Sequence, residues 1–81
     1  HMIFIANRKY QIVPNYAFNQ MFIFILALEN NSIELIEEKA FENIYNLRRL
    51  NLEFNKIKEL NPFYLNSYTL SLKNNRIEIL R

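Results

Sequence analysis

The sequence contains no cysteine, no glycine and no tryptophan, and it has only two prolines and one histidine. Without cysteine, the chain has neither disulfides nor thiolate ligands for a metal ion. Without glycine, it cannot build the glycine-rich loop that cradles phosphate groups. The single histidine belongs to His1-Met2, which resembles a cloning remnant and is set aside. These absences remove many of the residue types on which active sites and cofactor sites depend.

Few alternatives remain for catalysis. The serines and the single threonine have no base at a spacing that could activate a hydroxyl group. Glu37 and Glu38 are adjacent, whereas paired-carboxylate chemistry requires two groups that face one bond. No cluster of residues has the spacing of metal ligands. We therefore predict no catalytic, metal-binding or cofactor-binding residue, and we expect a protein that is not an enzyme.

Charge and hydropathy argue against nucleic acid and membranes as partners. The net charge is +2, with ten basic and eight acidic residues spread along the chain. A nucleic-acid-binding surface usually shows a basic stripe with interleaved aromatic residues, but the longest basic runs here are Arg8-Lys9 and Arg48-Arg49. The most apolar run, 21–28, is far shorter than the roughly 20 residues that cross a bilayer. We expect neither nucleic-acid binding nor membrane insertion.

The positive feature of the sequence is a repeated spacing of leucine, isoleucine and asparagine. Its clearest copy runs from Leu47 to Leu60, with apolar residues at 47, 50, 52, 57 and 60 and Asn55 among them. The alternation in the middle is typical of a half-buried strand. Asparagine suits the turn that follows, because its amide tolerates unusual backbone angles and bonds to loop backbone.

Further copies of this spacing lie on both sides. An earlier copy is centred on Asn31 and a later one on Asn75. A weaker copy opens the chain and has Arg8 at the asparagine position. The connecting segments match too, since Ala17-Phe18 follows Arg8 at the same interval at which Ala40-Phe41 follows Asn31. Two features that recur in one phase indicate an internal repeat.

This spacing resembles the leucine-rich repeat family, whose consensus is L-x-x-L-x-L-x-x-N-x-L-x-x-L. The copy that continues as Ala40-Phe41-x-x-Ile44-x-x-Leu47 is similar to the "typical" class of animal extracellular and innate-immune proteins. The resemblance implies an α/β fold, a right-handed superhelix or solenoid with a parallel β-sheet on its concave face and turns and one short helix on its convex face. It implies protein binding and favours an extracellular location, but it does not identify the partner, since the fold serves many functions.

We expect residues 1–81 to form one domain, as a piece of a longer array. The repeats are expected at about 3–22, 23–46, 47–66 and 67–81, counted from the consensus. Strands are expected at 3–6, 23–29, 49–53 and 69–73, a short helix at about 37–44 and a tight turn or a 3₁₀ turn at 61–65. The sequence leaves open whether Ile23 or Phe24 points into the core. Both ends lack the polar caps that terminal repeats need.

Asn31, Asn55 and Asn75 are predicted to form a structural asparagine ladder. Neighbouring strands lie about 4.8 Å apart, so each amide can bond to loop backbone in the adjacent repeat, and buried backbone groups require such partners. The alternative is a polar binding row. The inward direction of these positions favours the ladder.

Residues between the core leucines face the other side of the sheet, which the resemblance makes the concave, partner-binding face. The predicted contact residues are Phe4, Ile25, Ala27, Glu29, Arg49, Asn51, Glu53, Phe54, Ser71 and Lys73. Large apolar residues on this face favour an interaction site, although scattered surface hydrophobes are the simpler explanation. The like charges of Glu29 and Glu53 are expected to pair with Arg49 and Lys73.

Two functions of different classes are compatible with this sequence. The first is non-enzymatic protein binding through the concave face. The second is a structural role, in which the chain is a spacer of a larger solenoid, has no ligand of its own and self-associates into a homo-oligomer through its uncapped ends. A third possibility, a regulatory subunit docked on an enzyme, differs from the first only in the partner.

Overall fold

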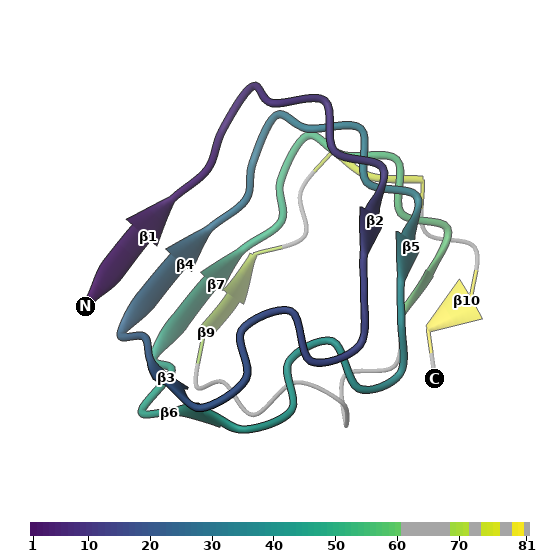
Figure 1. Ribbon diagram of the computed structural model, residues 1–81. Helices are drawn as coiled ribbons and strands as arrows, with labels where there is room; N and C mark the ends of the chain where they lie inside the picture. The colour runs from purple at the N-terminus through teal and green to yellow at the C-terminus, as the bar shows by residue number, and fades with distance from the viewer. Residues whose placement is uncertain (61–68, 72–73, 77–78, 81) are drawn as a thin grey trace.

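The computed structural model describes residues 1–60, 69–71, 74–76 and 79–80, which wind into four coils stacked side by side (Figure 1). Each coil contributes one strand to a four-stranded sheet, namely β1 (Met2–Phe4), β4 (Ile25–Ala27), β7 (Arg49–Asn51) and β9 (Thr69–Ser71). The strands are all parallel and lie in the order β1-β4-β7-β9. The predicted parallel sheet is therefore confirmed, although the tight turn expected at 61–65 lies outside the described residues.

The register of the sheet aligns the repeated leucines. Leu50 pairs with Leu26 on one side and with Leu70 on the other, and Leu26 pairs with Ile3. The strands are shorter than the spans predicted for them, and β1 begins at Met2, one residue before the predicted span. Backbone hydrogen bonds nevertheless continue past the strands, as from the Leu28 amide to the Asn51 carbonyl at 2.8 Å.

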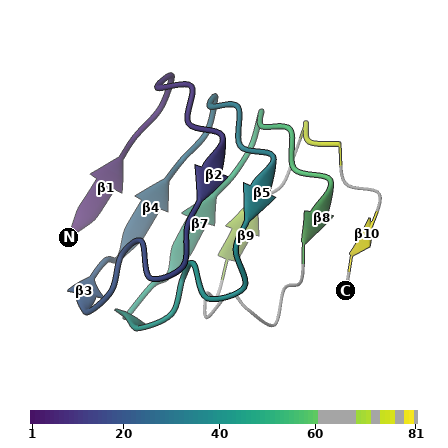
Figure 2. The ribbon, with the colours of Figure 1, turned by 45° about the vertical axis from the view of Figure 1, so that its right-hand side comes forward.

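Three short two-stranded ribbons, each of which joins two successive coils away from the main sheet, were not predicted. β2 (Ile12–Val13) pairs with β5 (Leu35–Ile36), β3 (Met21–Phe22) with β6 (Ile44–Tyr45), and β8 (Glu59–Leu60) with β10 (Ile79–Leu80). All are parallel. Figure 2 shows β2, β5, β8 and β10 in a row across the coils from the main sheet. Hydrogen bonds between coils thus run along several sides of the stack.

The short helix predicted over about 37–44 is not found, and residues 38–43 form turns. Ala40 donates to the Glu37 carbonyl and Glu42 to the Lys39 carbonyl, which are three-residue rather than four-residue spacings. The Lys39 carbonyl also accepts from the Tyr16 amide of the preceding coil, at 2.9 Å. Bonding between coils takes up acceptors that a helix would use, so tertiary context overrides the helical propensity of Glu37-Glu38-Lys39.

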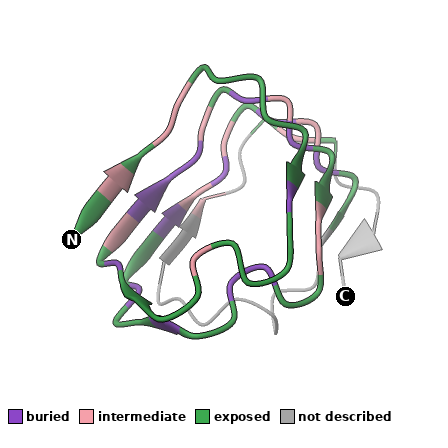
Figure 3. Ribbon diagram, in the orientation of Figure 1, coloured by how far each residue is buried: buried purple, intermediate pink, exposed green. Residues whose placement is uncertain are grey.

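The core lies between the main sheet and the outer ribbons of the second and third coils (Figure 3). Its most buried large side chains are Ile23, Leu26, Ile33, Leu50, Leu52 and Ile57. Ile23 is fully buried whereas Phe24 is 50% exposed, which settles the inward position that the sequence left open. Phe18 and Phe41 stack with ring centroids 6.3 Å apart, which joins the first coil to the second.

Candidate functional site

The three ladder asparagines lie one above another and join successive coils. Asn31 donates from Nδ2 to the Ile5 carbonyl of the first coil at 2.7 Å and accepts from the Arg8 amide at 2.9 Å. One coil later Asn55 makes the equivalent donation, to the Leu28 carbonyl at 3.0 Å. It accepts from the Ile33 amide at 3.1 Å, which lies two residues beyond the position that Arg8 holds in the first coil. Figure 1 shows the adjacent coils that these bonds connect.

Asn75 repeats the pattern in the fourth coil, donating to the Leu52 carbonyl at 2.7 Å and accepting from the Ile57 amide at 3.1 Å. Asn31 and Asn55 are buried, and both amides also bond within their own coil. Amides engaged on both sides in this way have little capacity left for a ligand. These contacts are structural, and the amides that make them do not form a polar binding row.

The residue before each asparagine position has a left-handed backbone. Its φ angle is 58° at Asn7, 55° at Asn30, 57° at Phe54 and 58° at Asn74. This conformation ends the strand and turns the chain toward the outer half of the coil. Asparagine tolerates it better than other residues with a Cβ atom, so Phe54 is the exception in the column.

The outward face of the main sheet, called the sheet face below, carries most of the predicted contact residues. The register places Phe4, Ala27, Asn51 and Ser71 in one column. Phe4 is 66% exposed and Ile25 is half-buried, but Ala27 is only 4% exposed. Its methyl group is too short to stand out between Phe4 and Asn51 on the neighbouring strands, so Ala27 offers little surface to a partner.

The predicted pairing of the sheet-face charges differs from the arrangement in the structure. Asn51 donates from Nδ2 to Glu29 Oε2 at 2.9 Å and accepts from the Glu53 amide at 2.9 Å. No ion pair joins Arg49 to either glutamate within the described part of the chain. Arg49 is four residues before Glu53, roughly 13 Å along an extended strand, whereas Asn51 is close enough to bond Glu29. Lys73 lies outside the described residues.

A shallow hollow of about 520 Å³ lies at the ends of the sheet strands, beside the ladder. Its side chains of interest are the Phe54 ring, which is half exposed, and the basic groups of Lys56 and Arg76. The exposed Asn30 and Asn74 flank it on neighbouring coils. The sequence predicts Phe54 as a contact residue. It does not single out the two basic residues, although they recur at the position after the ladder asparagine.

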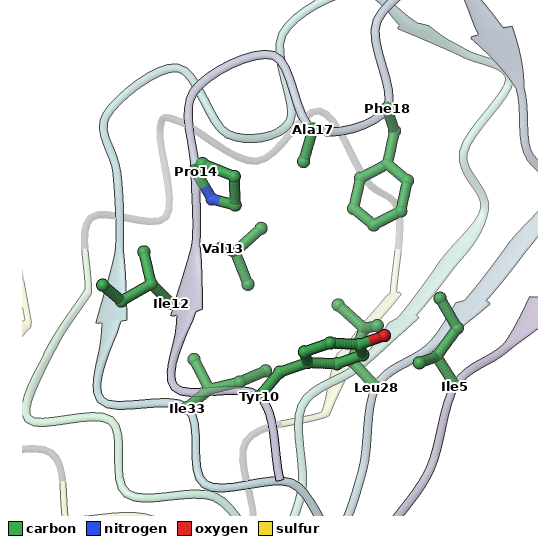
Figure 4. A pocket seen from close by; sticks show the side chains of 9 residues that line it. All are labelled: Ile5, Tyr10, Ile12, Val13, Pro14, Ala17, Phe18, Leu28 and Ile33. Atoms are coloured by element: carbon green, nitrogen blue, oxygen red, sulfur yellow. The ribbon is translucent and has the colours of Figure 1, made fainter. Parts of the chain in front are cut away.

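A second hollow, of about 210 Å³, opens at the N-terminal end of the stack. Figure 4 shows the apolar side chains that line it, among them Ile5, Tyr10 and Phe18 of the first coil and Leu28 and Ile33 of the second. In the first coil Ile5 and Phe18 are only half-buried, unlike Leu28 and Phe41 that follow them in the next coil. This end of the stack therefore leaves partly exposed the apolar side chains whose equivalents in the second coil are buried.

The described residues include no cluster of His, Cys, Asp or Glu suited to a metal ion, and none of their segments is a helix of the length and hydropathy that crosses a bilayer. Stacked parallel-strand coils joined by an asparagine ladder define a solenoid repeat protein. A leucine-rich repeat model matches residues 24–65, just over half of the chain, and the chain belongs to the leucine-rich repeat family. Members of this family generally mediate protein–protein interaction and are typically not enzymes. No curated protein and no solved structure matches the chain significantly.

Proposed function

We propose that the protein binds a protein partner through its sheet face, without catalysing a reaction. The observation that carries the proposal is the composition of this face, where the exposed Phe4 on β1 and the half-buried Ile25 on β4 give way to Arg49 and Asn51 on β7. Exposed apolar groups beside polar ones are typical of a protein interface. The family supports this function in general terms only, because the fold itself does not fix the partner.

The hydrogen bonds around Asn51 support the same proposal. By bonding to the Glu29 carboxylate and to the Glu53 amide, Asn51 holds one acidic side chain and the local backbone in place. Groups that are already fixed lose less conformational freedom when a partner binds. Arg49 stands exposed next to this cluster and can meet an acidic group of the partner.

Site-specific photo-crosslinking in the cells that make the protein tests the proposal. A photoreactive phenylalanine replaces Arg49 on the sheet face or, as the control, the exposed Lys39 on the outer turn. We expect a discrete crosslinked protein from position 49 and none from position 39. Identical products from both positions, or no product from position 49, would overturn the proposal.

A structural role is the second candidate, and the N-terminal hollow favours it. β1 is an edge strand of the main sheet, and an open edge beside exposed core is a template for another coil or a second copy. Sedimentation velocity should then show self-association that Ile12→Lys, at the exposed rim of the hollow, abolishes. A strict monomer at high concentration would exclude this role.

We further propose an extracellular, receptor-like setting, of the kind found for the "typical" repeat class in immune proteins. The support is the spacing from Asn31 to Asn55 with Ala40-Phe41 between them. Localisation of the tagged protein tests the setting, and an intracellular location would overturn it.

We also propose that the coils form a right-handed superhelix with a concave sheet face, because crossovers between parallel strands are right-handed. This proposal is separate from the extracellular setting.

A further inference from the structure

We propose that the hollow around Phe54 is an anchor site for an acidic segment of the protein partner, one that carries an apolar side chain next to a carboxylate. The proposal rests on the protein-binding function above and adds the chemistry of the partner. In this site the Phe54 ring contacts the apolar side chain of the partner, and Lys56 and Arg76 bind its carboxylate.

The first observation is the backbone of Phe54. Its φ of 57° is left-handed, and the other three residues of its column are asparagines. A bulky side chain is disfavoured in this conformation, and backbone outliers of this kind gather at functional sites. The conformation of the turn therefore does not explain why phenylalanine occupies this position.

The second observation is the exposure of the ring. Phe54 is 51% exposed and is not among the buried core side chains. The two ring stacks found in the described chain, Phe18 with Phe41 and Phe22 with Tyr45, do not include it. Core packing thus does not account for this aromatic group, whereas aromatic anchors often contribute a large share of the binding energy at protein interfaces.

The third observation is the charge beside the ring. Lys56 and Arg76 occupy the same position in successive coils, and their amides are fixed by bonds to the Ile33 and Ile57 carbonyls, at 2.8 and 3.1 Å. Neither side chain forms an ion pair with any residue that the structure describes. Two adjacent cations with no counter-charge among the described residues favour a carboxylate from outside, since hydrogen bonds between charged groups are the stronger ones.

An acidic peptide fits this combination better than a lone phosphate or a nucleic acid. A small anion would leave the Phe54 ring unused, and a nucleic acid requires a longer basic stripe than two residues provide. Asn30 and Asn74 add neutral amides on both sides of the ring, which can bond to the backbone of an extended segment. The site therefore selects for one apolar and one acidic group close together.

The test uses a displayed library of random 12-residue peptides, selected on the immobilised 81-residue chain. We expect enriched peptides to carry net negative charge and at least one large apolar residue. Their Kd should rise about tenfold or more for Phe54→Asn and for the double variant Lys56→Glu/Arg76→Glu, as expected for loss of an anchor. Enriched peptides that lack acidic residues, a selection that yields no binder, or binders unaffected by these variants would overturn the proposal.

Matched controls separate binding from folding. Tyr16→Asn replaces another exposed aromatic residue with left-handed backbone, at φ 58°, on an outer turn, and it should leave the Kd unchanged. Lys39→Glu is the charge control on the outer turn of the next coil. Since Phe54→Asn places asparagine where the other coils have it, the variant should fold at least as well as the original chain, and weaker binding cannot then be ascribed to unfolding.

A sheet-face variant distinguishes the two proposals, with the photoreactive phenylalanine moved from position 49 to the exposed Phe4 of the same face. If Arg49→Glu removes the crosslinked partner while the Phe54 and Lys56/Arg76 variants retain it, the protein-binding function stands and the anchor site is wrong. If none of these changes affects the crosslink, both proposals fail.

Discussion

The side-chain amide of Asn55 donates a 3.0 Å hydrogen bond to the carbonyl oxygen of Leu28, one coil earlier. The same carbonyl accepts from Asn31 of its own coil, also at 3.0 Å. Equivalent asparagines of successive coils thus share one backbone acceptor, and this sharing fixes the spacing of adjacent coils. The bonds are buried, so removal of one partner leaves polar backbone groups with neither a protein partner nor water to bond to.

Asn55→Ala should lower the free energy of unfolding by about 2–4 kcal/mol, because several buried hydrogen bonds are lost and carbonyls are left unsatisfied. Urea denaturation followed by circular dichroism measures the change. Asn19→Ala is the control, since it removes a single bond between exposed side chains, and it should cost at most about 0.5 kcal/mol. Equal effects of the two substitutions would show that the ladder bonds do not stabilise the fold.

The inward position of Ile23 leads to a second prediction. Ile23→Ala should cost about 2–5 kcal/mol, the usual range for a fully buried aliphatic side chain. Phe24→Ala removes a larger side chain, but one that is half exposed, and should cost less. If Ile23→Ala does not fold, Ile23→Val, with an expected cost of about 0.5–1.5 kcal/mol, gives the comparison. A larger cost for Phe24 would mean that the two residues exchange roles in solution.

Phe54→Asn should raise the stability of the chain. A left-handed residue with a Cβ atom costs roughly 1–2 kcal/mol, and asparagine reduces this cost through local hydrogen bonding. We expect a gain of up to about 1 kcal/mol in urea denaturation, with a similar gain for Tyr16→Asn. A loss of stability on Phe54→Asn would show that the ring makes packing contacts that outweigh the backbone strain.

Hydrogen exchange should distinguish the first coil from the second. The Ile5 and Leu28 amides hold corresponding positions and each donates at 2.8 Å to the next coil, to Ala27 and Asn51 respectively. Ile5 is half-buried near the open edge, whereas Leu28 is buried. The Leu28 amide should therefore exchange more slowly than the Ile5 amide. Exposing Ile5 at the edge requires fewer contacts to break than exposing Leu28. Equal protection would indicate that another chain covers the N-terminal end.

The repeated spacing was enough to predict which residues share a column, because strand alternation and the position of asparagine depend only on local chemistry. It could not predict the turns at 38–43. There the Lys39 carbonyl accepts from Tyr16 of the preceding coil, and a contact between coils leaves no mark in the local helical pattern. The short outer ribbons were not predicted for a different reason: strands of two residues are too short to show an alternating pattern.

The candidate site was predicted only in part. Alternation assigned Phe4, Arg49 and Asn51 to the sheet face, but the choice of Asn51 rather than Arg49 as the partner of Glu29 depends on the distance along the strand. The basic position at Lys56 and Arg76 was readable from the repeat alignment, because both follow a ladder asparagine. The left-handed backbone of Phe54 follows only from the structure, although its neighbours in the column are all asparagine.

The asparagines at the left-handed turns also affect the chain before it folds. Five of the positive-φ residues, Asn7, Asn30, Asn43, Asn46 and Asn74, occupy places where glycine would fit without steric cost. Glycine would widen the range of conformations open to the denatured ensemble, and each such residue would then lose more entropy on ordering. This restriction stabilises a small array with few coils. The conformational freedom of its denatured state is already reduced at the residues where the native turns form.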